Sequence, residues 1–145
     1  MKVINEARLE FPGLSANEAF ARSSAACFAA QLDPTLEELG DLKTAVSEAV
    51  TNCIVHAYPE KAGRVSLRLR VLEADVLEVR VRDWGTGIPD VEKAREPLFT
   101  TGGEERSGMG FSIMECFMDS LRVRSAPGKG TTVTMRKRIA GKAGR

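Results

Sequence analysis

Five segments of the chain alternate apolar and polar residues, the period-2 pattern that is typical of β-strands. They cover residues 3–11, 65–71, 77–81, 121–125 and 131–137. The second and third segments, and likewise the fourth and fifth, lie close enough in sequence to form hairpins. In the first hairpin one set of alternating positions is apolar and the other is mostly arginine. This pattern predicts an antiparallel sheet that is covered on one face and wet and cationic on the other.

Three helices are predicted between these strands. Ser15-Ala16-Asn17-Glu18 has the spacing of a capping box and begins a helix that runs to about Leu32. Asp33-Pro34 supplies a cap and a first-turn proline for a long helix over about 35–56. A third helix is expected over about 111–119. Because hairpins dominate the pattern, we expect an α+β fold, a two-layer sandwich with a mixed, mostly antiparallel sheet and helices on one face.

Composition narrows the class of protein. The chain has 145 residues, of which 43% are hydrophobic, and its formal net charge is +1. We therefore expect one domain over 1–145 with a packed core, and no direct binding of nucleic acid. The basic stretch at about 138–145 is expected to be a frayed tail. Charges interrupt the N-terminal segment where a signal peptide needs an apolar region, and no run is long enough to cross a membrane, so a cytoplasmic location is expected.

The three cysteines, Cys27, Cys53 and Cys116, are far apart and form no CxxC pair. An odd number with this spacing argues against a disulfide framework and against a zinc site. Each lies in an apolar stretch, which favours buried free thiols.

The long helix carries a candidate catalytic pair. Residues advance about 100° each around a helix, which places Glu48 and Asn52 on the same side, roughly opposite the apolar arc that includes Val46 and Val50. Asp41 and Ala45 share the side of Glu48 and Asn52. Taken alone, such a pair indicates only a solvated helix face with a hydrogen-bonded couple.

Two glycine-rich loops support a functional role for Glu48 and Asn52. Asp83-Trp84-Gly85-Thr86-Gly87 follows a predicted strand, and Gly108-Met109-Gly110 precedes an apolar helix start. Glycine lets a backbone approach a ligand closely, and a glycine-rich turn before a helix can bind an anion through free N–H groups. A lone GxG is weak evidence, and neither the GxxxxGK nor the GxGxxG motif is present.

Four motifs together resemble the GHKL ATP-binding proteins. Residues 47–52 with His56-Ala57-Tyr58 resemble the N box, 83–87 the first glycine box, 107–110 the second, and 130–132 the final strand motif. Within that superfamily the chain is most similar to the anti-sigma F factors over about 5–137. The stretches that carry this narrower resemblance are 17–22, 30–35, 97–101 and 105–111.

The resemblance implies roles for individual residues. Glu48 would be the general base, Asn52 would bind Mg²⁺, and Asp83 would accept a hydrogen bond from the adenine amino group, supported by Thr131. His56 is expected to be structural. The other residues implied in nucleotide binding are Gly85, Gly87, Thr100, Thr101, Ser107, Gly108, Met109 and Gly110. Arg22 and Arg106 are implied in partner binding.

The implied function is an anti-sigma factor that binds a sporulation-type sigma factor. With Mg²⁺ and ATP it would phosphorylate a serine of an anti-anti-sigma factor, and it would form a homodimer. A stress-response anti-sigma kinase and a non-catalytic nucleotide-gated module are the alternatives. A sensor histidine kinase is disfavoured because His56 is the single histidine. Residues 102–106 depart from the family pattern, and Trp84 is expected either near the nucleotide or covering its own loop.

Overall fold

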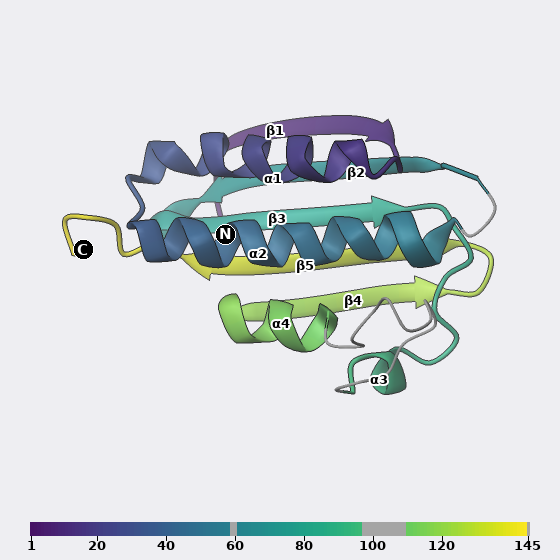
Figure 1. Ribbon diagram of the computed structural model, residues 1–145. Coiled ribbons are helices and arrows are strands. Elements are labelled where there is room, and N and C mark those ends of the chain that lie inside the picture. The colour runs from purple at the N-terminus through teal and green to yellow at the C-terminus, as the bar shows by residue number, and fades with distance from the viewer. Residues whose placement is uncertain (59–60, 97–109, 145) are drawn as a thin grey trace.

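The computed structural model describes residues 1–58, 61–96 and 110–144. Its strands form one sheet in the order β1-β2-β3-β5-β4, and every pairing is antiparallel (Figure 1). The strands are β1 (Val3–Pro12), β2 (Arg64–Leu72), β3 (Val76–Asp83), β4 (Ser120–Ala126) and β5 (Gly130–Arg138). The long helices lie together on one face of this sheet. The expected α+β two-layer sandwich is therefore confirmed.

The helical layer consists of α1 (Ala16–Ala29), α2 (Leu36–Asn52) and α4 (Gly110–Phe117), and a short helix α3 (Val91–Ala94) follows the loop after β3. Short 3-10 turns cover Ala30–Leu32 and Glu73–Asp75. The predicted long helix ends as an α-helix at Asn52 and continues as a wider π-helical turn over Cys53–Ala57. None of the helices in the described ranges is both long and apolar enough to span a bilayer.

The capping box occurs at a different place from the predicted one. Ser15 has helical dihedral angles and its side chain makes no capping bond. Glu18 instead accepts hydrogen bonds from Arg22 and Ser47. The reciprocal box forms at the start of α2, where Thr35 and Glu38 satisfy each other's backbone N–H groups. The prediction at Ser15 was wrong because a tertiary contact uses the glutamate that the box required.

The core lies between the inner face of the sheet and the helices. Register places Leu67, Val81 and Val133 side by side across three strands, and each is at most 5% exposed. Val46 and Val50 of α2 and Met114 of α4 belong to the same cluster. The alternation in sequence therefore predicted the buried side of the sheet correctly.

One flank of α2 is less exposed than the helical wheel suggested. Ala45, expected on the solvated side, is fully buried. The reason is that α4 packs along this flank. Glu48 and Asn52 lie close to Gly110 at the start of α4. At the end of α4 the Lys137 amine donates to the Phe117 carbonyl and lies 3.6 Å from the Asp41 carboxylate.

The outer face of the sheet is cationic, as predicted, but it is not wet throughout. Arg68 and Glu78 are only 9% and 3% exposed. The Glu78 carboxylate accepts hydrogen bonds from Arg68 and Arg136, each at 2.9 Å. Burial raises the pKa of Glu78, but the bonds from Arg136 and Arg68 outweigh it and leave the pKa lowered. Long arginine side chains lying along the sheet exclude water from one another.

Two of the three cysteines differ from expectation. Cys53 is buried, whereas Cys27 and Cys116 are exposed on α1 and α4. The apolar stretches around Cys27 and Cys116 belong to amphipathic helices, and their apolar neighbours occupy the buried side instead.

The C-terminal segment, expected to fray, is held against the start of α2. Ile139 is 1% exposed and its N–H donates to the Asp75 carbonyl. The N–H groups of Ala140 and Gly141 donate to the carboxylate of Glu38 at 2.7 and 3.0 Å. Although burial opposes it, these backbone bonds together with those from Thr35 lower the pKa of Glu38. The basic composition of the tail did not reveal this carboxylate acceptor.

Replacing Glu38 tests how firmly this segment is held. Glu38→Ala removes the acceptor for three backbone N–H groups and should lower the free energy of unfolding by about 1–2 kcal/mol at neutral pH. Since the folded-state pKa of Glu38 is lowered, its stabilisation is complete above the ordinary glutamate pKa and is lost as pH falls through the lowered value.

Urea unfolding of the variant and of the unsubstituted chain, repeated across acidic and neutral pH, measures this difference. Glu37→Ala is the matched control because Glu37 is exposed and has no hydrogen bond of this kind. A destabilisation by Glu38→Ala that stayed constant from neutral to strongly acidic pH would contradict the role of the charge.

Candidate functional site

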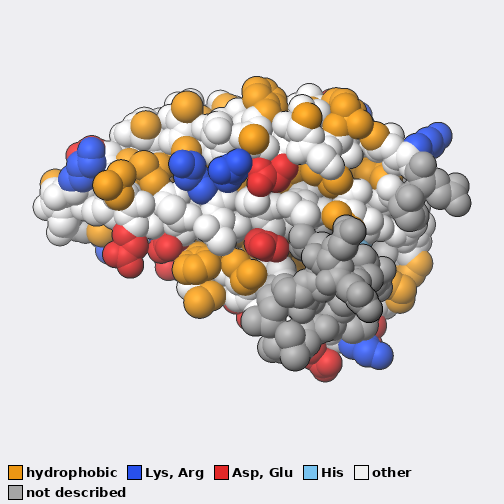
Figure 2. Space-filling model, in the orientation of Figure 1, with side chains coloured by type: hydrophobic (Ala, Val, Ile, Leu, Met, Phe, Trp, Pro, Cys, Tyr) orange, Lys and Arg blue, Asp and Glu red, His pale blue; other side chains and the backbone are white. Residues whose placement is uncertain are grey.

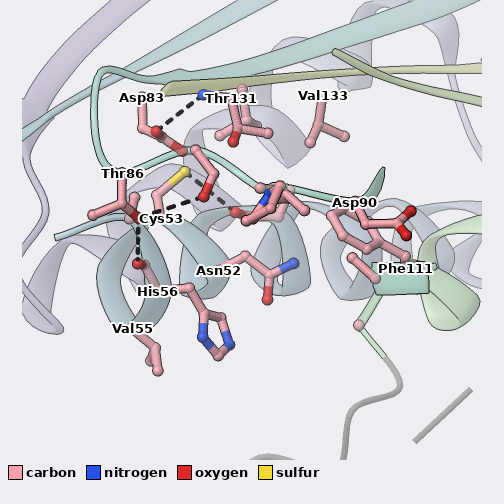
Figure 3. Close-up of a pocket in the computed structure, with 18 of the residues that line it drawn as sticks. Asn52, Cys53, Val55, His56, Asp83, Thr86, Asp90, Phe111, Thr131 and Val133 are labelled. Atoms are coloured by element: carbon pink, nitrogen blue, oxygen red, sulfur yellow. Dashed lines mark hydrogen bonds between the residues drawn. The ribbon is translucent and has the colours of Figure 1, made fainter. Parts of the chain in front are cut away.

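A cavity of about 740 Å³ opens between the end of α2, the ends of β3 and β5, and the loop after β3 (Figure 3). Its volume suits a drug-sized or nucleoside-sized ligand. Most of the lining is apolar, and a few polar side chains point into it. The polar lining includes Asn52, Asp83 and Thr131, and the apolar lining includes Ala49, Val81, Ile88, Phe111 and Val133.

Asp83 is the buried acid of this cavity. It ends β3 with its side chain toward the inner face, and it is 4% exposed. Its Oδ1 atom accepts hydrogen bonds from the N–H groups of Gly85 at 3.0 Å and Thr131 at 3.1 Å. Burial raises the pKa of Asp83, and the bonds from Gly85, the Cys53 thiol and Thr131 oppose that rise. The predicted partnership of Asp83 with Thr131 is thus made through the backbone of Thr131.

The loop after Asp83 is pressed between two other parts of the chain. A Cβ atom on Gly85 would lie 2.1 Å from the carbonyl oxygen of Ala57. Gly87 has a φ of +78°, and a Cβ there would lie 2.1 Å from the carbonyl oxygen of Ala126. Both glycines are therefore required by the close approach of protein backbone. This reason differs from the predicted one, which was close approach of the ligand, although Gly87 does line the cavity.

Hydrogen bonds fix the same loop on both sides. The Thr86 N–H donates to the Ala57 carbonyl, and the Thr86 hydroxyl to the His56 carbonyl. On the other side the Gly128 N–H donates to the Thr86 carbonyl at 2.7 Å. His56 also lines the cavity, and its expected structural role stays a prediction.

Trp84 points away from the cavity. Asp83 and Trp84 are consecutive, and Trp84 is absent from the cavity lining. Two guanidinium groups lie over its ring, with Arg64 3.7 Å and Arg82 4.6 Å from the ring centroid. The backbone N–H of Trp84 donates to the hydroxyl of Tyr58, which in turn donates to the Arg64 carbonyl. Of the two expectations for Trp84, the structure supports the one in which it covers its own loop.

Glu48 and Asn52 converge as the helical wheel predicted. A Cβ atom placed on Gly110 would lie 3.3 Å from Glu48 Oε2 and 3.3 Å from both terminal atoms of Asn52. A carboxylate and an amide therefore face the same small space at the start of α4. Asn52 also lines the main cavity, whereas Glu48 lines a neighbouring groove. The pair therefore lies between the cavity and the groove.

The oxygen atoms of Glu48 and Asn52 fit one kind of metal ion. The described ranges hold no group of three or more His, Cys, Asp or Glu side chains that could bind a metal alone. Mg²⁺ prefers oxygen ligands and keeps several waters, so a single amide oxygen at Asn52 would serve if phosphate oxygens supplied other ligands.

The neighbouring groove lies between α1 and α2, where basic and acidic side chains gather (Figure 2). Arg22 of α1 lines it, with its guanidinium Nε 3.1 Å from Glu18. The other Glu18 oxygen accepts from the Ser47 hydroxyl at 2.6 Å. Arg22, a predicted partner-binding residue, is thus linked by hydrogen bonds through Glu18 to Ser47, which precedes Glu48.

Several predicted site residues lie outside the described ranges. They are Thr100, Thr101, Arg106, Ser107, Gly108 and Met109, together with the segment 102–106. Other residues of the cavity were missed by the sequence reasoning. Val81 and Val133 stand two positions from Asp83 and Thr131 on the same strand faces, so the period-2 pattern was enough to find them. The helical period places Cys53 on the same side as Ala49, four residues earlier, so it could have been found in the same way.

The chain is similar in sequence to a known domain family and to known proteins. Residues 11–137 match the model of the histidine kinase-like ATPase domain. The chain is 56% identical over 140 residues to an anti-sigma F factor of Caldanaerobacter subterraneus subsp. tengcongensis, covering 96% of this chain and 97% of that protein. It is 54% identical over 138 residues to the anti-sigma F factor of Bacillus subtilis strain 168, covering 94% of each.

Solved structures support the fold. The RsbU and RsbW domains of a Mycobacterium tuberculosis protein align with a TM-score of 0.67 at 16% identity, covering 93% of this chain and 32% of that one. A histidine kinase domain from Erythrobacter litoralis aligns with a TM-score of 0.59 at 23% identity, covering 90% of this chain and 62% of that one. At these identities the likeness concerns the fold alone.

Substituting Gly85 tests the close packing of the loop. Gly85→Ala forces either the loop or the Ala57 carbonyl to move, and we expect a loss of about 1–3 kcal/mol in the free energy of unfolding. The matched control is Gly40→Ala, because a Cβ at Gly40 in α2 meets nothing within 4 Å. Alanine is the better helix former, so the control should be stabilised by up to about 1 kcal/mol. Thermal and urea unfolding measure both, and a Gly85→Ala variant as stable as the unsubstituted chain would contradict the packing.

Proposed function

Since the chain belongs to the histidine kinase-like ATPase family and, within it, to the anti-sigma F factors, we propose that it is an ATP-dependent protein serine kinase that also binds a sigma factor. The observation that carries the kinase proposal is the convergence of Glu48 and Asn52 on Gly110 at the rim of the cavity. An acid–amide pair beside a cavity of this size suits phosphoryl transfer with a bound metal ion, because that reaction depends mostly on positioning and charge neutralisation.

The adenine ring would occupy the deep end of the cavity. Val81 and Val133 offer apolar walls there, and the Asp83 carboxylate supplies an acceptor for the exocyclic amino group. Gly87 and Thr131 complete this end, and Gly85 acts by letting the loop close on Ala57. Because Oδ1 of Asp83 already accepts two backbone N–H groups, Asp83 is held in place before any ligand arrives. Such preorganisation reduces the entropy lost on binding.

The phosphates would lie toward Glu48, Asn52 and Gly110. Bound magnesium would neutralise phosphate charge, and Asn52 is the residue that would hold it. Glu48 would take the proton from a serine hydroxyl, for which it stands on the groove side of the pair. We extend the proposal, on the resemblance, to Thr100, Thr101, Ser107, Gly108 and Met109 as further nucleotide contacts.

The partners we propose are a sporulation-type sigma factor and an anti-anti-sigma factor that carries the phosphoacceptor serine. Arg22 supports this, because it lines the groove that leads to Glu48 and its side chain is 39% exposed. Arg106 is proposed as a second partner contact on the resemblance. No direct contact with nucleic acid and no membrane attachment are part of the proposal, and a cytoplasmic location suits these partners.

We also propose a homodimer, for which the outer face of the sheet is one available surface. Register aligns Arg8, Arg68, Arg80 and Arg122 in one row across that face. A second copy would bring like charges together unless the carboxylates of each copy met arginines of the other, so pairing there should depend strongly on salt. Sedimentation velocity at several salt concentrations would detect the dimer, and a monomer under all of them would contradict it.

Replacement of Glu48 tests the kinase proposal. Glu48→Gln keeps the shape of the side chain but cannot accept a proton, and it should lower the phosphorylation rate by about 10²–10⁴-fold. ADP binding should be retained, because Glu48 does not line the cavity that would hold the adenine ring. Transfer from labelled ATP to a serine-bearing anti-anti-sigma factor gives the rate, and calorimetry with ADP gives the affinity.

The matched control for this experiment is Asp83→Asn, which should lose nucleotide affinity as well as activity. A Glu48→Gln variant with the full rate would remove Glu48 from the role of base. A chain that binds ADP but transfers no phosphate to any serine-bearing partner would favour the non-catalytic module instead.

Charge reversal at Arg22 tests the partner surface. Arg22→Glu places a second carboxylate beside Glu18, so it should disrupt this side of the groove and weaken binding of the sigma factor by about tenfold or more. ADP affinity should be retained, because Arg22 does not line the nucleotide cavity. Titration of the sigma factor in the presence of ATP measures the effect, with Lys129→Glu, in the exposed turn between β4 and β5, as control. Unchanged sigma affinity would refute the contact.

A further inference from the structure

Ser125 of β4 joins three parts of the site through one hydroxyl. Its Oγ atom lies 2.7 Å from the N–H nitrogen of Ile88, 3.0 Å from the carbonyl oxygen of Gly130 and 2.8 Å from Oγ1 of Thr131. Ile88 and Thr131 both line the cavity, whereas Ser125 does not. A polar side chain behind the wall of a site can act only through the residues it touches.

The direction of each hydrogen bond follows from the number of protons. A serine hydroxyl has one proton to donate and two lone pairs to accept with. The Ile88 N–H can only donate and the Gly130 carbonyl can only accept. All three contacts are satisfied in one arrangement only, in which Ser125 donates to Gly130 and accepts from Ile88 and from the hydroxyl of Thr131.

This arrangement fixes what Thr131 presents to the cavity. Because the hydroxyl proton of Thr131 is directed to Ser125, the lone pairs of its Oγ1 atom remain for a ligand or a bridging water. The neighbouring Asp83 carboxylate is also an acceptor, and its Oδ1 atom is fixed by the N–H groups of Gly85 and Thr131. The deep end of the cavity therefore offers two acceptors and no side-chain donor from this pair.

We propose that Ser125 is a specificity-determining residue that acts by holding Thr131 as an acceptor. The inference rests on the proposed binding of an adenine nucleotide in this cavity. The 6-amino group of adenine is a donor and suits two acceptors. The 6-oxo group of hypoxanthine or guanine is an acceptor and meets only repulsion there, as long as the Thr131 hydroxyl cannot turn to donate to it.

Removing the Ser125 hydroxyl should have two separable effects. In Ser125→Ala the Ile88 N–H loses its acceptor, which loosens the cavity wall and weakens all purine nucleotides to a similar degree. The Thr131 hydroxyl also becomes free to rotate and donate to a 6-oxo group. Only the second effect changes the ratio of affinities for two nucleotides that differ at position 6.

The test measures the dissociation constants of ADP and IDP with magnesium by calorimetry. The unsubstituted chain should prefer ADP by about a hundredfold or more. In Ser125→Ala this preference should fall about tenfold, the worth of one hydrogen bond. Ser125→Thr keeps the hydroxyl and should restore the preference. Ser120→Ala, on an exposed position of the same strand, is the matched control and should leave the preference unchanged.

A double substitution separates this mechanism from a general loss of structure. Thr131→Val removes the hydroxyl that Ser125 is proposed to orient. Adding Ser125→Ala to Thr131→Val should then cause no further change in the preference, even if both affinities fall. An unchanged preference in Ser125→Ala would overturn the inference, and so would an equal loss in the Thr131→Val background. Failure of the unsubstituted chain to bind ADP would instead overturn the proposed function itself.

Discussion

The structure depends on satisfying one buried carboxylate. Asp83 ends β3 at 4% exposure, and a carboxylate at such depth is strongly disfavoured unless fixed donors surround it. Its donors come from separate segments: Gly85 from the following loop and Thr131 from β5. The β3–β5 register must therefore bring Thr131 beside Asp83, and the loop must turn back sharply enough for Gly85. The glycines and the backbone bonds to Ala57 and Gly128 are consequences of that requirement.

Helix α2 connects this end of the site to the proposed chemical end. Ala49, Asn52 and Cys53 line the cavity, and Asn52 also faces the start of α4 together with Glu48. One rigid helix therefore sets the distance between the buried carboxylate and the acid–amide pair. The π-helical turn over Cys53–Ala57 ends this helix and allows the carbonyls of His56 and Ala57 to bond with Thr86. Wide turns of this kind are frequent at functional sites.

Local pattern predicted a large part of this arrangement. Period-2 alternation gave the strands and their buried face, and the helical period brought Glu48 and Asn52 together. The errors arose where a distant contact decided the outcome. Glu18 accepts a hydrogen bond from Ser47, 29 residues away, instead of forming a local capping box. Glu38 accepts one from Ala140 of the C-terminal segment, 102 residues away. The role of Ser125 was missed for the same reason, because it becomes visible only when β4, β5 and the loop at Ile88 are placed together.

The peptide unit between Asp83 and Trp84 connects the two faces of the sheet. Consecutive strand residues point to opposite faces, so Asp83 enters the cavity while Trp84 lies on the outer face in contact with Arg64 and Arg82. Tyr58 accepts from the N–H of Trp84, which belongs to the peptide bond that follows Asp83. The same Trp84 packs its ring against the guanidinium groups of Arg64 and Arg82. The geometry of the buried acid therefore depends on the packing of an arginine-rich surface on the opposite face from the ligand cavity.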